Sequence, residues 1–241
     1  MQWRDTALIL GGRRFGESGL ILDTLTATRG RRSGLVYGGA SRNKRAQFEA
    51  GNTIELSWTG RLEEQLGRFD VAEVLTSRAG RYLDRPEALV AFTTIAALLR
   101  GAVDEGDITG SNLYQPTTVL LESLDNWPVW PALYAKWELG LLSSLGFGLD
   151  LETCALSGAN DGLTHVSPKT GRAVRGSEAE DYVERLFPLP AFLIDSSALA
   201  MAEDIQDALR LTGYFLDDRL FSSFHKPLPP ERARLVPKLI G

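Results

Sequence analysis

Short apolar runs separated by polar turns fill the first third of the chain. Five of these runs predict β-strands, at residues 6–10, 20–25, 33–39, 53–59 and 69–75. The fourth run alternates strictly, with Ile54, Leu56 and Trp58 on one face and polar residues on the other, as in a half-buried antiparallel strand. Gly11-Gly12 is expected to end the first strand, and residues 13–17 are expected to form a turn. Five short strands within about 80 residues predict a small barrel or a sandwich.

The apolar positions change to helical spacing after residue 83. Asp84-Arg85-Pro86 is a helix start, and apolar residues follow it every three or four positions up to Val103. Two further helices are predicted at about 116–124 and at 130–146. The capping-box pattern of residues 177–180 predicts a helix from 177 to about 186, and a long helix is predicted at about 198–221. Residues 147–176 are rich in Gly, Ser and Thr and are expected to be irregular or to hold a hairpin, whereas the proline-rich tail is expected to be extended before a final turn. The chain is therefore predicted to be an α+β protein with a β domain at 1–83 and a helical domain at 84–241, interrupted by an insertion at about 150–176.

One stretch of the predicted β domain, residues 28–45, is strongly basic. It contains no Asp or Glu, and its six cations are Arg29, Arg31, Arg32, Arg42, Lys44 and Arg45. They flank a predicted strand that carries Tyr37, and a strand with a basic loop at each end suits a phosphate-binding surface on a small barrel. A solvated basic turn explains the same residues equally well. In the first reading the cations contact nucleic-acid phosphates, and Tyr37 either stacks on a base or packs in the core.

Charge and cysteine content narrow the class of protein. Residues 1–85 hold 14 Lys and Arg against 10 Asp and Glu, and residues 86–241 hold 12 against 21. A basic first part joined to an acidic second part indicates one surface for a polyanion and another that repels it. The single cysteine, Cys154, excludes an internal disulfide and fits a reducing compartment, so we expect a cytoplasmic protein, which the resemblance described below would make nucleoid-associated.

Patterns that indicate catalysis or metal binding are weak. The glycines at 11–16 have the wrong spacing for a dinucleotide fingerprint, and the match of residues 41–44 to Ser-x-x-Lys lacks the companion motifs. His165 and His225 are far apart in sequence, and neither has a neighbouring carboxylate. Zinc needs about four ligands, whereas the insertion offers Cys154 and His165. We therefore expect no enzymatic activity, no metal and no cofactor.

Several motifs, in order, resemble the RecO family of bacterial recombination mediators. The N-terminal third has Arg14-Phe-Gly-Glu-Ser18, Thr24-Leu-Thr26 and Gly38-Gly-Ala-Ser-Arg42 between its strands. The predicted helix from Lys136 is similar to the family helix that ends in Leu-Gly-aromatic-Gly, here Leu145-Gly-Phe-Gly148. Residues 154–158 and 166–172 are similar to a cysteine-bearing insertion that holds zinc in many members. Here Ser157 and Arg175 stand where cysteines are expected, and the chain has Pro230-Glu-Arg232 where the family usually shows Ser-Arg.

The resemblance implies a fold, an activity and partners. It implies an N-terminal OB barrel and a helical C-terminal domain without zinc. It also implies binding to single- and double-stranded DNA, strand annealing, and help in loading recombinase at gaps together with RecR and single-strand-binding protein. The acidic, apolar C-terminal tail of single-strand-binding protein would suit the apolar stripe beside the only cation of the helix at 131–146. The residues concerned are Leu133, Lys136, Trp137 and Leu141, and an ordinary core helix explains them as well. An OB-fold module that binds RNA or the ribosome remains the alternative.

Overall fold

The computed structural model describes residues 1–62, 65–126 and 129–240. The chain forms two compact units, which are described separately. The first contains residues 1–122 and 229–235, and the second contains residues 123–228 and 236–241. The helix α6 (Pro230–Ile240) contributes to both units, so the tail is helical over 11 residues, and the prediction of an extended tail with a single final turn was wrong.

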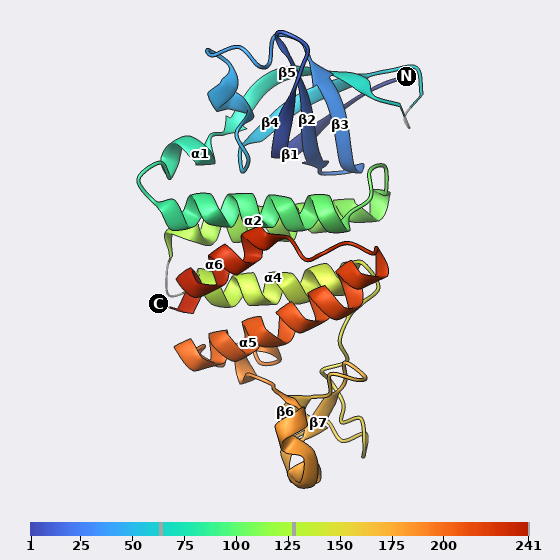
Figure 1. The fold of residues 1–241 in the computed structure, drawn as a ribbon, viewed down its shortest axis with the longest axis vertical. Helices are drawn as coiled ribbons and strands as arrows, with labels where there is room; N and C mark the ends of the chain where they lie inside the picture. Colours follow the sequence, from blue (N-terminus) through green and yellow to red (C-terminus); the bar gives the residue numbers. More distant parts are fainter. Residues whose placement is uncertain (63–64, 127–128, 241) are drawn as a thin grey trace. The chain divides into compact units, whose positions relative to one another are not determined.

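The first unit is built on a five-stranded barrel (Figure 1). Its strands are β1 (Gln2–Phe15), β2 (Gly19–Thr26), β3 (Gly30–Val36), β4 (Thr53–Thr59) and β5 (Gly67–Thr76). The order β1-β2-β3-β5-β4 closes because β1 also pairs with β4. The seam between β3 and β5 is parallel and spans only two residue pairs, whereas the other neighbouring strands pair antiparallel over most of their length. This topology confirms the predicted OB-fold barrel.

The first strand is longer than its sequence predicts. The pairing of β1 with β2 shifts between Ile9 and Gly11, so that Leu10 is an extra residue on β1 and the strand continues to Phe15. Gly11 has a φ of 146°, which a side chain would disfavour. Leu10 and Gly11 thus form a bulge that bends the strand, and the prediction that Gly11-Gly12 ends it was wrong. The third strand was also misplaced, because β3 begins at Gly30 and ends before Tyr37.

The barrel interior is filled by the residues that the alternation of β4 placed there. Ile54, Leu56 and Trp58 are all at most 2% exposed, and the ring of Trp58 stacks on that of Trp3 with centroids 5.7 Å apart. Gly34 leaves room for this packing, since a Cβ there would lie 2.6 Å from the ring of Phe69. Large side chains of neighbouring strands therefore pack on one another inside the barrel, and Trp3 and Trp58 form a direct cross-strand pair of β1 and β4.

Helical segments after residue 77 complete the first unit. They are α1 (Arg78–Arg81), α2 (Pro86–Ala102), η2 (Ile108–Leu113) and α3 (Tyr114–Glu122). The turn between β2 and β3 packs against the backbone before η2, where a Cβ on Gly30 would lie 1.9 Å from the carbonyl oxygen of Asp107. Phe92 of α2 packs on the backbone of Gly51, which lies just before β4. The barrel and these helices therefore form one compact unit.

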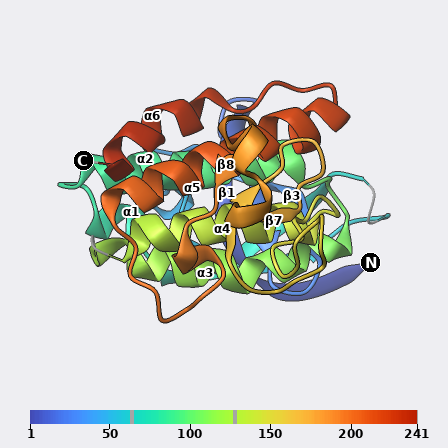
Figure 2. The same cartoon turned by 90° about the horizontal axis from the view of Figure 1, so that it is seen from below.

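The second unit contains two long helices that pack side by side, α4 (Trp130–Ser144) and α5 (Ala202–Phe215) (Figure 2). A π-helical segment (Leu216–Phe221) continues α5, so the predicted long helix exists but begins four residues later than expected. The predicted helix at 177–186 was wrong. Two short 3-10 segments (Gly176–Glu178 and Glu180–Arg185) replace it, and Tyr182 inside the second segment has a non-helical φ of −144°. The remaining short 3-10 segments are Arg45–Phe48, Ser123–Asp125 and Ala191–Leu193.

A small sheet is formed by two strands of the predicted insertion at about 150–176 and by a third strand that follows it. It consists of β6 (Leu163–Val166), β7 (Ala173–Arg175) and β8 (Phe187–Pro188), with β6 in the middle and both pairings antiparallel. The β6–β7 pair is the hairpin that the sequence allowed at residues 147–176. We call residues 147–188 the hairpin lobe.

Candidate nucleic-acid interface

The first three cations of the basic stretch lie close to protein groups. Arg31 is only partly exposed and pairs with Asp23 at 2.8 Å. Its guanidinium also donates to the carbonyl oxygens of Arg100 and Val103. Burial by itself lowers the pKa of Arg31, but the hydrogen bond and the charge of Asp23 more than offset this and raise that pKa above its ordinary value. The hydrogen bonds of Arg31 therefore connect β3 of the barrel to the C-terminal end of α2.

Arg29 and Arg32 lie on either side of Arg31. The guanidinium of Arg29 lies over the ring of Trp3, 5.2 Å from its centroid. That of Arg32 approaches Gly106, where a Cβ would lie 3.3 Å from its Nη1. Both side chains are half-buried. Of the seven residues that the sequence assigned to DNA, these three therefore have the least free surface for a ligand.

The other three cations project from a well-anchored segment between β3 and β4. Arg42, Lys44 and Arg45 are all exposed, and the side chain of Arg45 is 80% exposed while lying 3.7 Å from Glu49. Phe48 inserts into the barrel core, and the Asn52 amide donates to the carbonyl oxygens of Ala46 and Gln47. The backbone is thus fixed while the charges extend into solvent. We call residues 42–45 the basic loop.

Tyr37 is not a core residue. Its side chain is 65% exposed, and the guanidinium of Arg68 on β5 lies 5.6 Å from its ring centroid. Tyr37, Lys44 and Arg68 line one hollow of about 350 Å³. Asp70 also lines this hollow and pairs with Arg68. The structure brings a flat, exposed ring next to cations, which is the arrangement that stacking on nucleobases uses.

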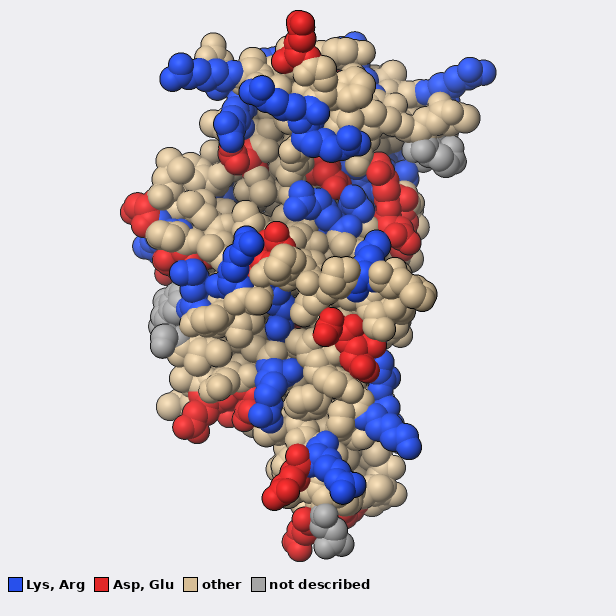
Figure 3. All heavy atoms as spheres, in the orientation of Figure 1, with Lys and Arg blue, Asp and Glu red and all other residues tan. Residues whose placement is uncertain are grey.

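A second hollow of about 560 Å³ brings together Arg14, Arg45 and Arg100 from three separate elements. The sequence analysis missed Arg14 and Arg100, because nothing local connects a residue of β1 with one near the end of α2. Figure 3 shows that several Lys and Arg side chains lie on the visible face of the barrel, in the upper part of the view, with fewer Asp and Glu among them. We call this second hollow the arginine groove.

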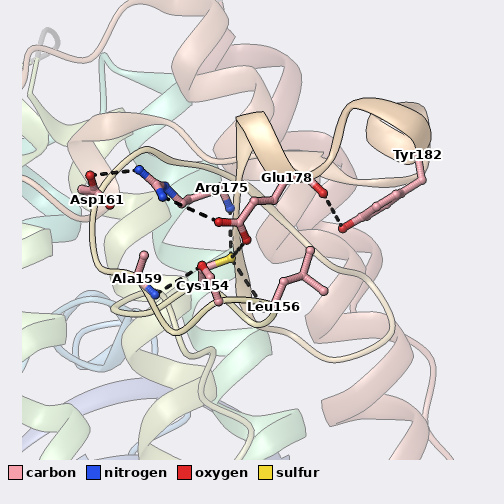
Figure 4. A network of polar contacts seen from close by, with 8 residues as sticks. Cys154, Leu156, Ala159, Asp161, Arg175, Glu178 and Tyr182 are labelled. Carbon is pink, nitrogen blue, oxygen red and sulfur yellow. Dashed lines mark hydrogen bonds and ion pairs between the residues drawn. The ribbon is translucent and has the colours of Figure 1, made fainter.

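The residues around Cys154 do not fit a zinc ion. The described residues contain no group of three or more His, Cys, Asp or Glu close enough to hold a metal. Cys154 is 1% exposed, and its thiol donates to a Glu178 oxygen at 3.2 Å (Figure 4). Arg175, which stands where the family has a cysteine, places its cation between Asp161 at 3.1 Å and Glu178 at 3.6 Å. A cation of the protein therefore neutralises the two carboxylates that a metal would need.

Hydrogen bonds to the sulfur complete this network. The backbone N–H groups of Arg175 and Leu156 donate to Sγ of Cys154 at 3.3 and 3.5 Å. Burial alone would raise the pKa of the Cys154 thiol, but these donors and those of Ser157 bring it below its ordinary value. The pKa of Glu178 is lowered, first by a hydrogen bond from Ser157 and next by the Cys154 thiol. We call Cys154, Asp161, Arg175 and Glu178 the thiol–carboxylate network.

The predicted partner stripe on α4 is mostly internal. Trp137 is 4% exposed and Leu141 is fully buried, whereas Leu133 and Lys136 are half-buried. The ammonium of Lys136 lies 5.9 Å from the ring centroid of Phe192, which belongs to the same unit. Only Leu133 and Lys136 remain accessible to a partner. Among the described residues, no helix combines the length and the apolar character that a membrane crossing needs.

The closed five-stranded barrel and its cationic surface define an OB-fold protein with a helical second part. Sequence comparison gives the family. The model described as "Recombination protein O N terminal" matches residues 1–78, and "Recombination protein O C terminal" matches residues 83–228. The chain is 68% identical to DNA repair protein RecO of Hyphomonas neptunium over 99% of this chain and 98% of the relative. It is 42% identical to DNA repair protein RecO of Methylorubrum extorquens, over 98% and 97% of the two chains. The chain belongs to the RecO family of DNA repair and recombination proteins.

Proposed function

We propose that this chain is a recombination mediator that acts by binding DNA and not by turnover. It binds single- and double-stranded DNA, anneals complementary strands, and helps to load recombinase at gaps together with RecR and single-strand-binding protein. The observation that carries the DNA-binding proposal is the exposed basic loop beside Tyr37 on an OB barrel. The DNA repair names of the full-length relatives support the same reading.

The chemistry of the surface suits annealing. Arg42, Lys44 and Arg45 present charges that contact phosphates, and phosphate contacts position a strand without reading its bases. A strand held through its backbone keeps its base edges free for pairing with a second strand. Tyr37 adds a stacking surface, commonly worth about 1–3 kcal/mol per base.

The experiment compares the parent with the Arg42→Ala/Lys44→Ala/Arg45→Ala variant in binding to single-stranded DNA at several salt concentrations. Each neutralised phosphate contributes roughly −0.7 to the slope of log affinity against log salt for a single strand, so the variant slope should be shallower by about 2. Binding should weaken by a similar factor on every sequence. The parent should also anneal complementary strands that are coated with single-strand-binding protein, and the variant should anneal them more slowly.

The control is Arg210→Ala, which removes an exposed charge of α5 and should leave the slope unchanged. Equal slopes of log affinity against log salt for the parent and the triple variant would show that the basic loop does not contact DNA. Tighter binding to RNA than to single- or double-stranded DNA of the same sequence would favour an RNA-binding module instead.

For the second unit, we propose that Leu133 and Lys136 of α4 bind the acidic C-terminal tail of single-strand-binding protein. Lys136→Glu should weaken binding of a tail peptide at least several-fold, because it places a negative charge against the acidic peptide, and should leave DNA affinity unchanged. Fluorescence anisotropy with a labelled tail peptide measures this, with Lys169→Glu as a matched charge reversal in the hairpin lobe. Equal peptide affinity for the parent and Lys136→Glu would remove α4 from the tail site.

A further inference from the structure

The arginine groove is built by elements that are distant in sequence but belong to the first unit. Arg14 comes from β1, Arg45 is the last residue of the basic loop and the first of the 3-10 segment Arg45–Phe48, and Arg100 comes from the last turn of α2. A third hollow, of about 230 Å³, is lined by Arg13 and Arg31 and shares Gly12 and Arg100 with the arginine groove. Arg100 therefore lies where the two hollows meet.

The cations of the groove are available to an anion. Within the described part of the chain, no carboxylate forms an ion pair with the guanidinium of Arg14 or of Arg100. Two carboxylates line the groove, those of Glu49 and Glu231. Glu49 lies 3.7 Å from Arg45, and this pair is largely exposed, so it is worth little and is easily exchanged for a pair with phosphate. The groove has three guanidinium groups against two carboxylates.

Three glycines of the first unit lie in the lining of the groove, and one of them packs against Arg100. Gly11, Gly12 and Gly39 line it, and the side chain of Arg100 lies over Gly11, where a Cβ would be 2.7 Å from Nη1. The β-bulge thus places Arg100 directly on the barrel backbone, although Arg100 belongs to a helix. Arginine offers several N–H donors in a fixed plane, which suits the oxygens of a phosphate.

We propose that the arginine groove holds the phosphodiester backbone of single-stranded DNA, with Arg14 and Arg100 as phosphate contacts in addition to the basic loop. This inference rests on the proposed DNA-binding function and assigns part of the path of the strand. A volume of about 560 Å³ is that of a pocket for a small ligand, commonly about 300–1,000 Å³, so it admits a short length of one strand. Since Arg45 belongs to both the basic loop and the groove, the strand runs continuously from one to the other.

The test is the Arg14→Gln/Arg100→Gln variant of the full chain, which removes two charges and keeps side chains of similar polarity. With roughly −0.7 per phosphate, its salt slope on single-stranded DNA should be shallower by about 1.4, and its affinity at 0.1 M salt should fall by about 25-fold. Arg100→Lys keeps the charge and should retain most of the slope. The matched control Arg210→Gln removes one exposed charge outside the groove and should bind as the parent does.

The outcomes distinguish the proposed role of the arginine groove from the proposed DNA-binding function of the chain. An unchanged slope for Arg14→Gln/Arg100→Gln, with a shallower slope for the basic-loop variant, would overturn the groove and leave DNA binding intact. Absence of DNA binding by the parent would overturn the proposed function itself. A loss on duplex but not on single strands would also overturn the groove as a single-strand site. Near-ultraviolet circular dichroism of each variant shows whether the fold is kept. If the Gln pair unfolds, the single variant Arg14→Gln decides, because Arg14 is exposed: its slope should be shallower by about 0.7, and an unchanged slope would overturn the groove.

Discussion

A single buried guanidinium, that of Arg78, joins three parts of the first unit. The residue is 2% exposed and donates to the carbonyl oxygen of Gly51 at 3.0 Å and to the Thr53 hydroxyl at 2.7 Å. It also forms an ion pair with Glu122 at the end of α3, whose side chain is 49% exposed. The barrel, α1 and α3 thus meet at one side chain, which composition alone would count as one more surface charge.

Replacing Arg78 should therefore destabilise the protein. We expect Arg78→Met to lower the free energy of unfolding by about 2–4 kcal/mol, since each buried acceptor left without a donor costs about 1–3 kcal/mol. Arg68→Met should cost no more than about 0.5 kcal/mol, because the Arg68–Asp70 pair is about half exposed. Urea unfolding followed by circular dichroism compares the two variants. Equal losses would mean that Arg78 carries no more than a surface ion pair.

The six cations of the basic stretch show what a local pattern can predict at the scale of the residue. The sequence identified the stretch but could not separate Arg31 from Arg42. The difference depends on Arg100, Val103 and Glu105, which lie about 70 positions further along the chain. The exposure of Tyr37 likewise depends on where β3 ends. The charge pattern of the sequence therefore identifies a basic segment, whereas contacts with residues distant in sequence determine which of its cations are exposed to a ligand.

At the scale of the element, strand alternation was the most reliable signal. The predicted bounds of β4 match the structure residue for residue, because the strand has one buried and one exposed face. The bulge in β1 was missed, since Gly-Gly usually marks a turn and only the register with β2 shows that the strand continues. The capping-box pattern at 177–180 predicted a helix, but Glu178 there serves Cys154 and Arg175 instead. The contacts of Glu178 with Cys154 and Arg175 therefore override the helix propensity of that segment.

The thiol–carboxylate network makes the hairpin lobe sensitive to acid. The pKa of Glu178 is lower in the folded protein than in the unfolded chain. Its contribution to stability is therefore complete above its ordinary pKa, roughly 4.3, and is lost as the pH falls through the folded value. We expect Glu178→Gln to lower the melting temperature at pH 7, and the difference from the parent to shrink below about pH 4.

Thermal melts of the parent and of Glu178→Gln at pH 7, 5 and 3.5 measure this effect. Glu180→Gln is the matched control, because Glu180 is exposed and its side chain takes part in none of the contacts described for the lobe. A difference that persists unchanged at pH 3.5 would mean that the ionised carboxylate of Glu178 is not what holds the lobe. Because the network already neutralises its own carboxylates, a metal chelator should leave the melting temperature of the parent unchanged.

At the scale of the whole molecule, the boundary at residue 83 stays a prediction, but many contacts of the first unit cross that position. Arg31 donates to backbone oxygens of residues 100 and 103, and a carboxylate oxygen of Glu105 accepts from the backbone N–H of Ser33 at 2.7 Å. Phe92 and Ile95 of α2 are at most 3% exposed and line a small cavity with Leu8 and Leu10 of β1. The compact unit therefore includes residues up to 122, together with residues 229–235 of the tail.

We accordingly expect a fragment of residues 1–83 to be much less stable than one of residues 1–122. The shorter fragment loses the acceptors of Arg31, the ion-pair partner of Arg78 and the apolar cover of β1 by α2. Fully burying one large apolar side chain is worth about 1.5–3 kcal/mol, so the loss of Phe92 and Ile95 costs about 3–6 kcal/mol, which is comparable to the lower end of the total stability of a domain, about 5–15 kcal/mol. Urea unfolding should be cooperative for residues 1–122 and broad for residues 1–83.

The longer fragment also tests the DNA path. It keeps the barrel, the basic loop and Arg14, and it keeps Arg100, which a cut at residue 83 removes. Residues 1–122 should therefore reproduce the salt slope of the full chain on single-stranded DNA, since the slope reports the number of neutralised phosphates. Cooperative unfolding of residues 1–83 at the same urea midpoint as residues 1–122 would show that the barrel is stable without α2. A slope for residues 1–122 much shallower than that of the full chain would place major phosphate contacts after residue 122.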